Sequence, residues 1–474
     1  MSIVNGFLTL LNWIFNSGAA LIVPISVLLI GLVFRAPFKR NFTGALKLAV
    51  GFTATDALLG VIFGAMDPAA YALSTRFGFN FPITDVGWPI GIPIVWGVPW
   101  SVLVIAILIV ANGVLVSLGV VKTLNVDVHN MVVFVFYGAC VYYVTGSWLW
   151  TVLIITITWF ISLKLADWIH PFLSPYYKMS FDSITISHPY AIQWAPIGFV
   201  MDKIYDKIPG IKNIKLDADT IQNKFGVFGD TIFVGFAVGF LVGAIAFFDL
   251  PFTLDQLGQA LSLGFTVAMF MYLVPRAAEL LISGLQPLSM AIRDFVATRL
   301  KGREFYVGMD VALLIGSPEH TAIGVLTTPL AFLIAFLLPW NKMLPLGDVA
   351  GLFIFICVFI TNTCRGNIFR GLLNSVLLIS CSLLVGGALA PANMEIVAAT
   401  NYVIPAGMTM ISTMCWGTTP VFYAIYEIII FIAVSHNVAD LIIAIAILVI
   451  FFGSWYLMKN RPQEYAKELL EADE

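Results

Sequence analysis

The stretch VPWSVLVIAILIVANGVLVSLGVV, residues 98–121, decides the fold, because it is apolar along its whole length and carries no charged side chain. A helix needs about 20 such residues to cross the hydrocarbon core of a bilayer. Comparable apolar runs recur from one end of the chain to the other, which neither a signal peptide nor a single anchor would produce. We therefore interpret the stretch as one of many membrane spans.

The composition of all 474 residues supports this interpretation. Hydrophobic residues make up 60% of the chain and charged residues 11%, which leaves too little polar surface to coat a water-soluble protein of this size. The formal net charge of −3 excludes a nucleic-acid-binding protein, which would need a concentrated basic face. Walker A, GxSxG and HExxH motifs are absent from the sequence, so it predicts no ATPase domain of its own, no metal and no cofactor.

The fold class we expect is an all-α polytopic membrane protein with about eleven transmembrane helices. The apolar runs that predict these helices are residues 19–35, 43–66, 98–121, 129–147, 149–168, 228–248, 255–275, 321–339, 347–363, 368–390 and 437–457. Basic residues follow the first and the last run. The positive-inside rule therefore places both of these flanking segments in the cytoplasm.

Four segments depart from this pattern of spans. Residues 200–225 mix lysines with acidic residues and predict a cytoplasmic surface loop. Residues 276–304 are amphipathic and predict a helix that lies along the membrane interface. Residues 178–200 and 400–422 are rich in Ser, Thr, Pro and Gly between apolar turns, which is typical of re-entrant hairpins.

The spacing of four Asp-Val pairs predicts an internal repeat. Asp85 and Asp127 lie 42 residues apart (127 − 85), and Asp310 and Asp348 lie 38 apart (348 − 310). In both halves a glycine and then a tryptophan shortly before a proline follow in the same order and at similar intervals. Inverted repeats of this kind are a feature of secondary transporters, and the solute site lies where the two halves meet.

The repeat divides the chain into parts without separating it into independent domains. We expect one permease unit over residues 1–474. Its first repeat half is 1–225, with a hairpin near 178–200. Its second half is 226–436, with a hairpin near 400–422, and residues 437–474 hold the last span and a cytoplasmic tail.

Carboxylates inside apolar segments are the strongest sign of a solute site, because a lone carboxylate in hydrocarbon costs several kcal/mol and persists only beside a cavity or a partner. Asp85, Asp127, Asp310 and Asp348 are the candidates. A carboxylate can accept hydrogen bonds from two neighbouring hydroxyls of a polyol. The alternative is that each aspartate caps the N-terminus of a helix, and we favour this alternative for Asp348.

Histidines and an asparagine add to the candidate site. His129 and Asn130 open a span beside Asp127, and His188 lies at the expected tip of the first hairpin. His320 follows a glutamate at the start of another span, and it is a weaker candidate. We expect His170 and His436 to be structural.

Arg365, in the CRGN stretch between two spans, could contact a phosphoryl group or could anchor the chain at the cytoplasmic face. Both interpretations stay open from the sequence.

Several long and irregular stretches resemble one known family. They are TDVGWP (84–89), NVDVHN (125–130), KLADW (164–168), IPGIKNIKLDADTIQNKFGVFGD (208–230), EFYVGMDVALLIG (304–316), LPLGDVA (344–350) and RGNIFR (365–370). They resemble enzyme IIC, the membrane permease of the galactitol-type phosphoenolpyruvate-dependent sugar phosphotransferase system. The chain is more distantly similar to the ascorbate permease of the same superfamily.

The resemblance implies group translocation at the bacterial inner membrane. A polyol such as galactitol would be carried inward and phosphorylated by a separate IIB protein that bears a phosphocysteine and is itself served by IIA. The resemblance also implies a homodimer with a mobile core that moves like an elevator. This chain would therefore be the membrane part of a phosphotransferase complex, and the phosphoryl donor would lie on its partner.

By the ascorbate relative, the positions of Asp85, Val86, His129, His188 and Asp310 fall at or near the solute site. His188 is our first candidate for the base, with Asp85, Asp310 or a group on IIB as the alternatives. Arg365 stays a candidate to contact the phosphoryl group. This chain has small or apolar residues directly after its first aspartate and a proline after its hairpin histidine. The family contacts therefore do not all transfer directly.

Two other functions compete with this one. An ion-coupled secondary transporter of the same shape would use an intramembrane aspartate to bind a proton or sodium. A membrane-embedded enzyme would need a nucleophile with its base or a metal cluster, and the sequence shows neither.

Overall fold

A computed structural model describes most of the chain. The described residues are 24–77, 81–177, 184–214, 231–298, 305–309, 318–348, 357–400 and 408–473, without 26, 30, 33 and 126 and with 216, 402 and 404 added. Asp310 lies outside this set, as do parts of both predicted hairpins and of the predicted span 347–363.

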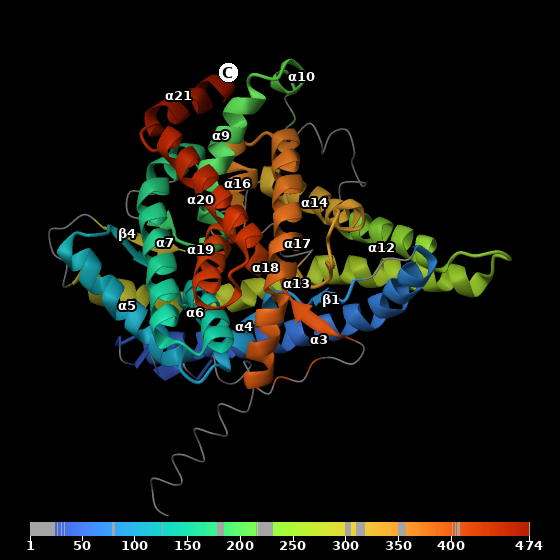
Figure 1. Ribbon diagram of the computed structural model, residues 1–474, viewed down its shortest axis with the longest axis horizontal. Coiled ribbons are helices and arrows are strands. Elements are labelled where there is room, and N and C mark those ends of the chain that lie inside the picture. The colour runs from blue at the N-terminus through green and yellow to red at the C-terminus, as the bar shows by residue number, and fades with distance from the viewer. Residues whose placement is uncertain are drawn as a thin grey trace, which may run out of the picture.

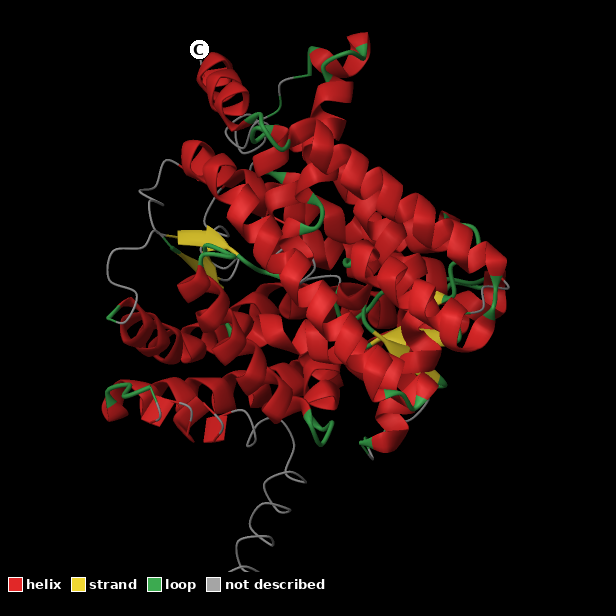
Figure 2. Ribbon diagram, turned by 60° about the vertical axis from the view of Figure 1, so that its left-hand side comes forward, coloured by secondary structure: helices red, strands yellow, loops and turns green. Residues whose placement is uncertain are grey.

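Long helices form most of the described structure (Figures 1 and 2). They are α3 (Phe38–Phe77), α4 (Trp88–Trp96), α5 (Ser101–Leu118), α6 (Val128–Thr145), α7 (Trp148–Tyr177), α9 (Ala195–Tyr205), α12 (Thr231–Phe247), α13 (Leu254–Ala297), α14 (Pro318–Leu337), α17 (Ile368–Ala399), α19 (Pro420–Ile430), α20 (Val438–Met458) and α21 (Pro462–Asp473). Shorter turns are α8 (Pro189–Ile192), α10 (Pro209–Lys212), α16 (Cys357–Ile360), η3 (Asn362–Cys364), α18 (Met414–Gly417) and η4 (Phe431–Ser435).

Four of the described helices are long and apolar enough to cross a membrane. They span Ser101–Leu118, Trp148–Leu173, Ile368–Ala399 and Val438–Met458, and each overlaps one of the predicted spans. The window of Val438–Met458 is only 22% buried inside the protein, so most of its apolar surface faces outward. A helix with that surface needs a hydrocarbon solvent.

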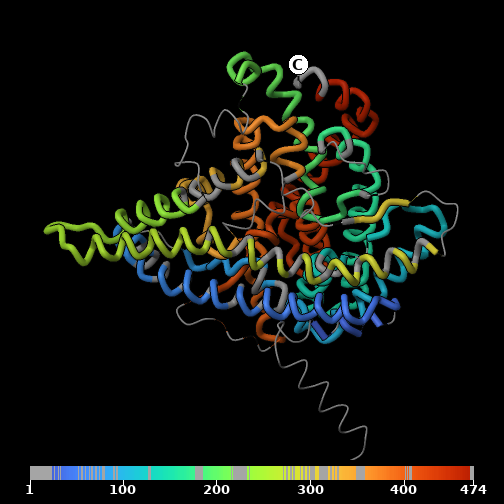
Figure 3. The backbone as a smooth tube through the Cα atoms, turned by 180° about the vertical axis from the view of Figure 1, so that it is seen from behind, coloured from blue at the N-terminus to red at the C-terminus, as the bar shows by residue number. Residues whose placement is uncertain are grey.

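Helices α3, α12 and α13 pack against one another in an elongated layer that runs across the upright helices α7 and α17 (Figure 1), and α3 and α13 run side by side across the molecule (Figure 3). Glycines bring these helices close together. A Cβ added at Gly239 of α12 would lie 2.8 Å from Gly264 Cα of α13, so neither position tolerates a larger side chain without a shift.

Helix α13 differs from the prediction. We expected a span at 255–275 followed by a separate interfacial segment at 276–304, but the structure has one continuous helix from Leu254 to Ala297. The helix continues through Pro275 and Pro287, although proline often ends a helix. Hydropathy changes along the helix without marking its end.

Six short strands in the described ranges make the expectation of a purely helical chain incomplete. They are β1 (Ile83–Asp85), β2 (Thr123–Asn125), β3 (Ile184–Ile186), β4 (Tyr306–Met309), β5 (Met343–Leu344) and β6 (Met410–Ser412). Each is two to four residues long, too short for the alternation by which a strand is recognised in a sequence.

These strands form two parallel sheets, and each sheet combines strands from distant parts of the chain. Sheet A has the order β5-β1-β6, and sheet B has the order β2-β4-β3. The central strand of each sheet is therefore flanked by two strands from the other part of the chain. Figure 2 shows the two sheets as separate groups of strands.

The strands β3 and β6 are followed by the same arrangement of helices. A four-residue helix and then an eleven-residue helix follow each strand, α8 and α9 in one case and α18 and α19 in the other. The helices begin at Pro189 and Ala195 and at Met414 and Pro420, 225 positions later in both cases (414 − 189 and 420 − 195). His188 therefore lies at a turn between a strand and a helix.

Candidate functional site

The carboxyl ends of the strands of sheet B bring most predicted site residues to one place. Because the three strands are parallel, their carboxyl ends lie at the same edge. Asp127, His129 and Asn130 follow β2, and His188 follows β3 after one residue. Asp310 follows β4 directly in the sequence and lies outside the described residues.

A chain of buried hydrogen bonds holds this edge together. Asn112 of α5 makes two hydrogen bonds to the backbone of β2. Its Nδ2 donates to Thr123 O (2.9 Å), and its Oδ1 accepts from Asn125 N (2.6 Å). Asn125 Oδ1 accepts from the backbone N–H of Asp127 (3.2 Å) and from Asn130 Nδ2 (3.2 Å).

The same amide of Asn130 links β2 to the residue that follows β3. Asn130 Nδ2 also donates to Ser187 Oγ (3.1 Å), next to His188. Asn125, Asn130, Ser187 and His188 are all fully buried. The edge therefore consists of polar side chains inside a membrane protein, where burial is expensive unless the groups serve structure or a ligand.

His188 is fixed by its backbone and by an aromatic neighbour. Its carbonyl accepts from Ala191 N (3.1 Å) and Ile192 N (3.2 Å), the first turn of α8. Its ring meets the ring of Tyr190 edge-on, with 4.8 Å between centroids. The buried ring is at the base of the α8–α9 segment, so movement of that segment would move it.

Asp85 and Asp348 lie at sheet A, and their oxygens accept backbone hydrogen bonds. Asp85 accepts from Gly87 N (3.1 Å), Asp348 N (2.8 Å) and Met414 N (3.1 Å). Asp348 accepts from Trp88 N (2.7 Å) and Cys415 N (2.9 Å). Asp348 thus caps helices, as favoured from the sequence, although they are helices distant from it in the chain.

The remaining histidines occupy other positions. His320 is buried in the first turn of α14. The ring of His170 stacks on Tyr306 of β4, with 3.8 Å between centroids. His436 is exposed and ends η4 in the left-handed conformation. Within the described ranges, no three His, Cys, Asp or Glu side chains lie close enough to hold a metal ion.

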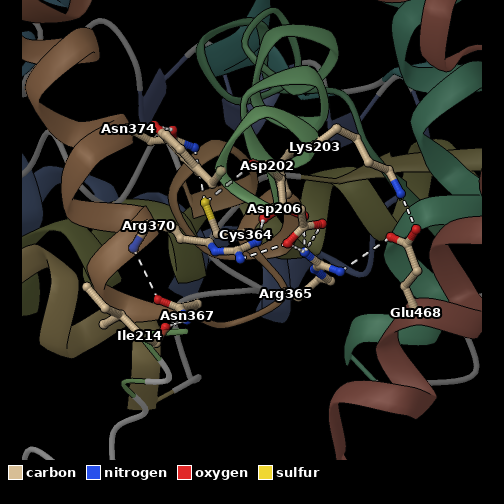
Figure 4. A network of polar contacts seen from close by, with 12 residues as sticks. Asp202, Lys203, Asp206, Ile214, Cys364, Arg365, Asn367, Arg370, Asn374 and Glu468 are labelled. Carbon is tan, nitrogen blue, oxygen red and sulfur yellow. Dashed lines mark hydrogen bonds and ion pairs between the residues drawn. The ribbon is translucent and has the colours of Figure 1, made fainter. Parts of the chain in front are cut away.

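Arg365 is the centre of an ionic cluster at the end of the molecule where the C-terminus lies (Figures 1 and 4). Its guanidinium lies 2.8 Å from Asp202, 2.8 Å from Asp206 and 3.5 Å from Glu468. Arg370 pairs with the same two aspartates, at 2.5 and 2.8 Å. The cluster joins α9, the turn before α17, and α21.

This cluster corrects the prediction of a surface loop at 200–225. Residues 200–205 belong to α9, and Asp202 is buried. Burial raises the pKa of Asp206, but its contacts with Arg370 and Arg365 lower the pKa by more, so it lies below its ordinary value. Asp206 therefore stays ionised at neutral pH and keeps its ion pairs.

The C-terminal helix is held to the same end by further contacts. Lys203 pairs with Glu464 (3.2 Å) and with Glu468. The hydroxyl of Tyr465 donates to the carbonyl of Asn362. Helix α21 thus packs on α9 and on the turn that carries Arg365.

Sequence reasoning missed Asn112, Asn125 and Ser187 at sheet B. The only signal was a polar residue inside or directly before an apolar run, and an isolated asparagine there is also common in loops. The three-residue strands that position these side chains could not be predicted from the sequence.

Comparison with known proteins gives consistent matches. Residues 13–413 match the sequence model of the family described as PTS system sugar-specific permease component. The chain is 29% identical over 422 residues to the PTS system galactitol-specific EIIC component of Escherichia coli strain K12, an alignment that covers 89% of this chain and 91% of that protein. The protein of the same description from Escherichia coli O157:H7 matches with the same identity and coverage. The matched residues include every strand of sheet B.

Proposed function

Because the chain belongs to the family of sugar-specific permease components of the phosphotransferase system, we propose that it carries a polyol, galactitol or a close relative, into the cell. It is an integral protein of the inner membrane, and its apolar helices agree with that location. The relatives described as galactitol-specific support the substrate class.

The observation that carries the proposal is the polar edge of sheet B. It combines amides, a histidine and a carboxylate, groups that can donate to and accept from hydroxyls of a neutral solute. We propose Asp127, His129, Asn130, His188 and Asp310 as the solute-binding residues. Asp85 and His320 stay proposed members, although the oxygens of Asp85 already accept backbone hydrogen bonds.

Transport would be coupled to phosphorylation by a separate IIB protein, supplied in turn by IIA. A solute hydroxyl that attacks a phosphoryl group must lose its proton, and His188 is the proposed base, because an imidazole nitrogen can accept a proton. Arg365 is the proposed phosphoryl contact. Its guanidinium would then have to exchange one of its carboxylates for the phosphoryl oxygens.

We also propose that the protein is a homodimer with an elevator-like mobile core built from an inverted repeat. Two observations support the repeat. In each sheet the central strand comes from one part of the chain and its two neighbours from the other, and the helix pair α18–α19 repeats the lengths and the spacing of α8–α9. The strand–helix segments at 184–205 and 410–430 would be parts of the two re-entrant hairpins.

Proteoliposomes test the function directly. With phosphorylated IIB inside, labelled galactitol should appear in the lumen as its phosphate ester, and a panel of unlabelled polyols should compete in the order of their affinity. Energised uptake of unmodified solute in the absence of IIB and phosphoenolpyruvate would contradict the proposal and favour an ion-coupled transporter.

A further inference from the structure

Two side chains at the polar edge of sheet B have hydrogen-bonding atoms for which the described residues provide no partner. Asn125 Nδ2 and Asn130 Oδ1 are buried, and no described residue provides either atom with a partner. Both side chains are fully buried. A buried polar atom without a partner is destabilising, so two of them on side chains that contact each other point to a ligand that completes them.

The orientation of both amides is fixed by the bonds they do make. Asn125 Oδ1 accepts from a backbone N–H, that of Asp127, which can only donate. The remaining atom of Asn125 is therefore the NH₂ donor. Asn130 Nδ2 donates to that same oxygen and to Ser187 Oγ, so the remaining atom of Asn130 is the carbonyl acceptor.

The pair thus offers one donor and one acceptor from two side chains that touch each other. A hydroxyl group can use both, because its oxygen accepts and its hydrogen donates. A carboxylate could use only the donor, and an ammonium only the acceptor. From this we infer that Asn125 and Asn130 together bind one hydroxyl of a neutral polyol, an inference that rests on the proposed function.

This assigns a role in specificity to Asn125. The residue lies at the last position of β2, and Asn112 holds that strand from the side of α5. Its unused NH₂ group is therefore presented from a rigid element. A site built to hydrogen-bond a hydroxyl rejects an analogue that lacks the hydroxyl, because the buried polar groups are then left unpaired.

Binding of deoxygalactitols to the full-length protein in nanodiscs tests the inference. Each analogue lacks one hydroxyl, and its dissociation constant is compared with that of galactitol. In the native protein, one analogue should bind at least about tenfold more weakly, the scale of a lost buried hydrogen bond. In Asn125→Ala this ratio should fall to within about twofold of one, while the ratios of the other analogues stay unchanged.

Two further variants make the result specific. Asn130→Ala removes the acceptor and should bring the same ratio of dissociation constants close to one, as Asn125→Ala does. The test therefore stays decisive if one of the two variants fails to fold. Asn393→Ala is the matched control, because Asn393 is a buried asparagine that donates to Ile411 at sheet A and whose oxygen has no partner among the described residues. It should leave every ratio unchanged.

The outcomes separate the inference from the function on which it rests. If the native protein binds polyols but the Asn125 and Asn130 variants keep all ratios, the two amides hold only water and the inference is wrong. If the native protein binds no polyol, the proposed function is wrong and the inference fails with it.

Discussion

Asp85 and Asp348, 263 positions apart in the sequence, bind each other's chain segments. Asp85 Oδ2 accepts from the backbone N–H of Asp348 (2.8 Å), and Asp348 Oδ1 accepts from that of Trp88 (2.7 Å). The crossing is tight, since a Cβ added at Gly347 would lie 2.3 Å from Gly87 N. Both carboxylates also accept from the first residues of α18, so three distant segments meet at two side chains.

The first prediction concerns this crossing. Asp348→Asn should lower the melting temperature in detergent, because an amide cannot accept at both atoms and leaves a buried N–H of Trp88 or Cys415 unpaired, at about 1–3 kcal/mol. Thermal unfolding of the purified protein measures the effect. The affinity of the folded fraction for galactitol should stay native, and a selective loss of affinity at native stability would assign Asp348 to the solute site.

Asp310→Asn should have the opposite effect to Asp348→Asn: native stability and a loss of transport. Removing the charge from a proposed solute contact leaves the volume of the side chain unchanged, so folding should persist while galactitol uptake is abolished. Expression, melting temperature and uptake are measured together with those of the Asp348 variant. Native uptake by a well-expressed Asp310→Asn protein would remove this residue from the proposed site.

These two aspartates show what the sequence could and could not predict. Each precedes a valine in an apolar stretch, and nothing local distinguishes a cap from a solute contact. The difference depends on which strands pair, and strands of two to four residues carry too little pattern to predict pairing. The positions of the four described spans were predictable, because about 20 apolar residues leave few alternatives. The order of Asp-Val pairs predicted a repeat, but not that strands cross between the halves.

Arg365 yields a prediction about stability. Its side chain is 15% exposed and its partner Asp202 4%, so Arg365→Gln leaves buried carboxylates with too little positive charge. Breaking such a pair costs about 3–5 kcal/mol, and we expect a large fall in melting temperature and release of α21.

A lysine at an exposed ion pair provides the control for this variant. Lys164 is 49% exposed and pairs with Asp167, so Lys164→Gln should cost no more than about 1 kcal/mol. Limited proteolysis of the C-terminal tail reports the release of α21. If Arg365→Gln melts like the native protein and keeps its tail protected, the cluster is not what holds α21.

The last prediction separates recognition from proton transfer at His188. Its ring is buried, and the preceding residue, Ser187, accepts a hydrogen bond from Asn130. In the proposed site the ring can orient a hydroxyl or accept its proton. His188→Gln keeps a hydrogen-bonding group of similar size but removes the imidazole nitrogen that would accept the proton. Galactitol binding should therefore survive, while phosphorylation by phosphorylated IIB should fall about a hundredfold or more, the scale of a lost general base. His436→Gln, at an exposed turn, should change neither quantity. If binding and phosphorylation fall together, His188 is a recognition residue, and the proton is taken by a carboxylate or by a group on IIB.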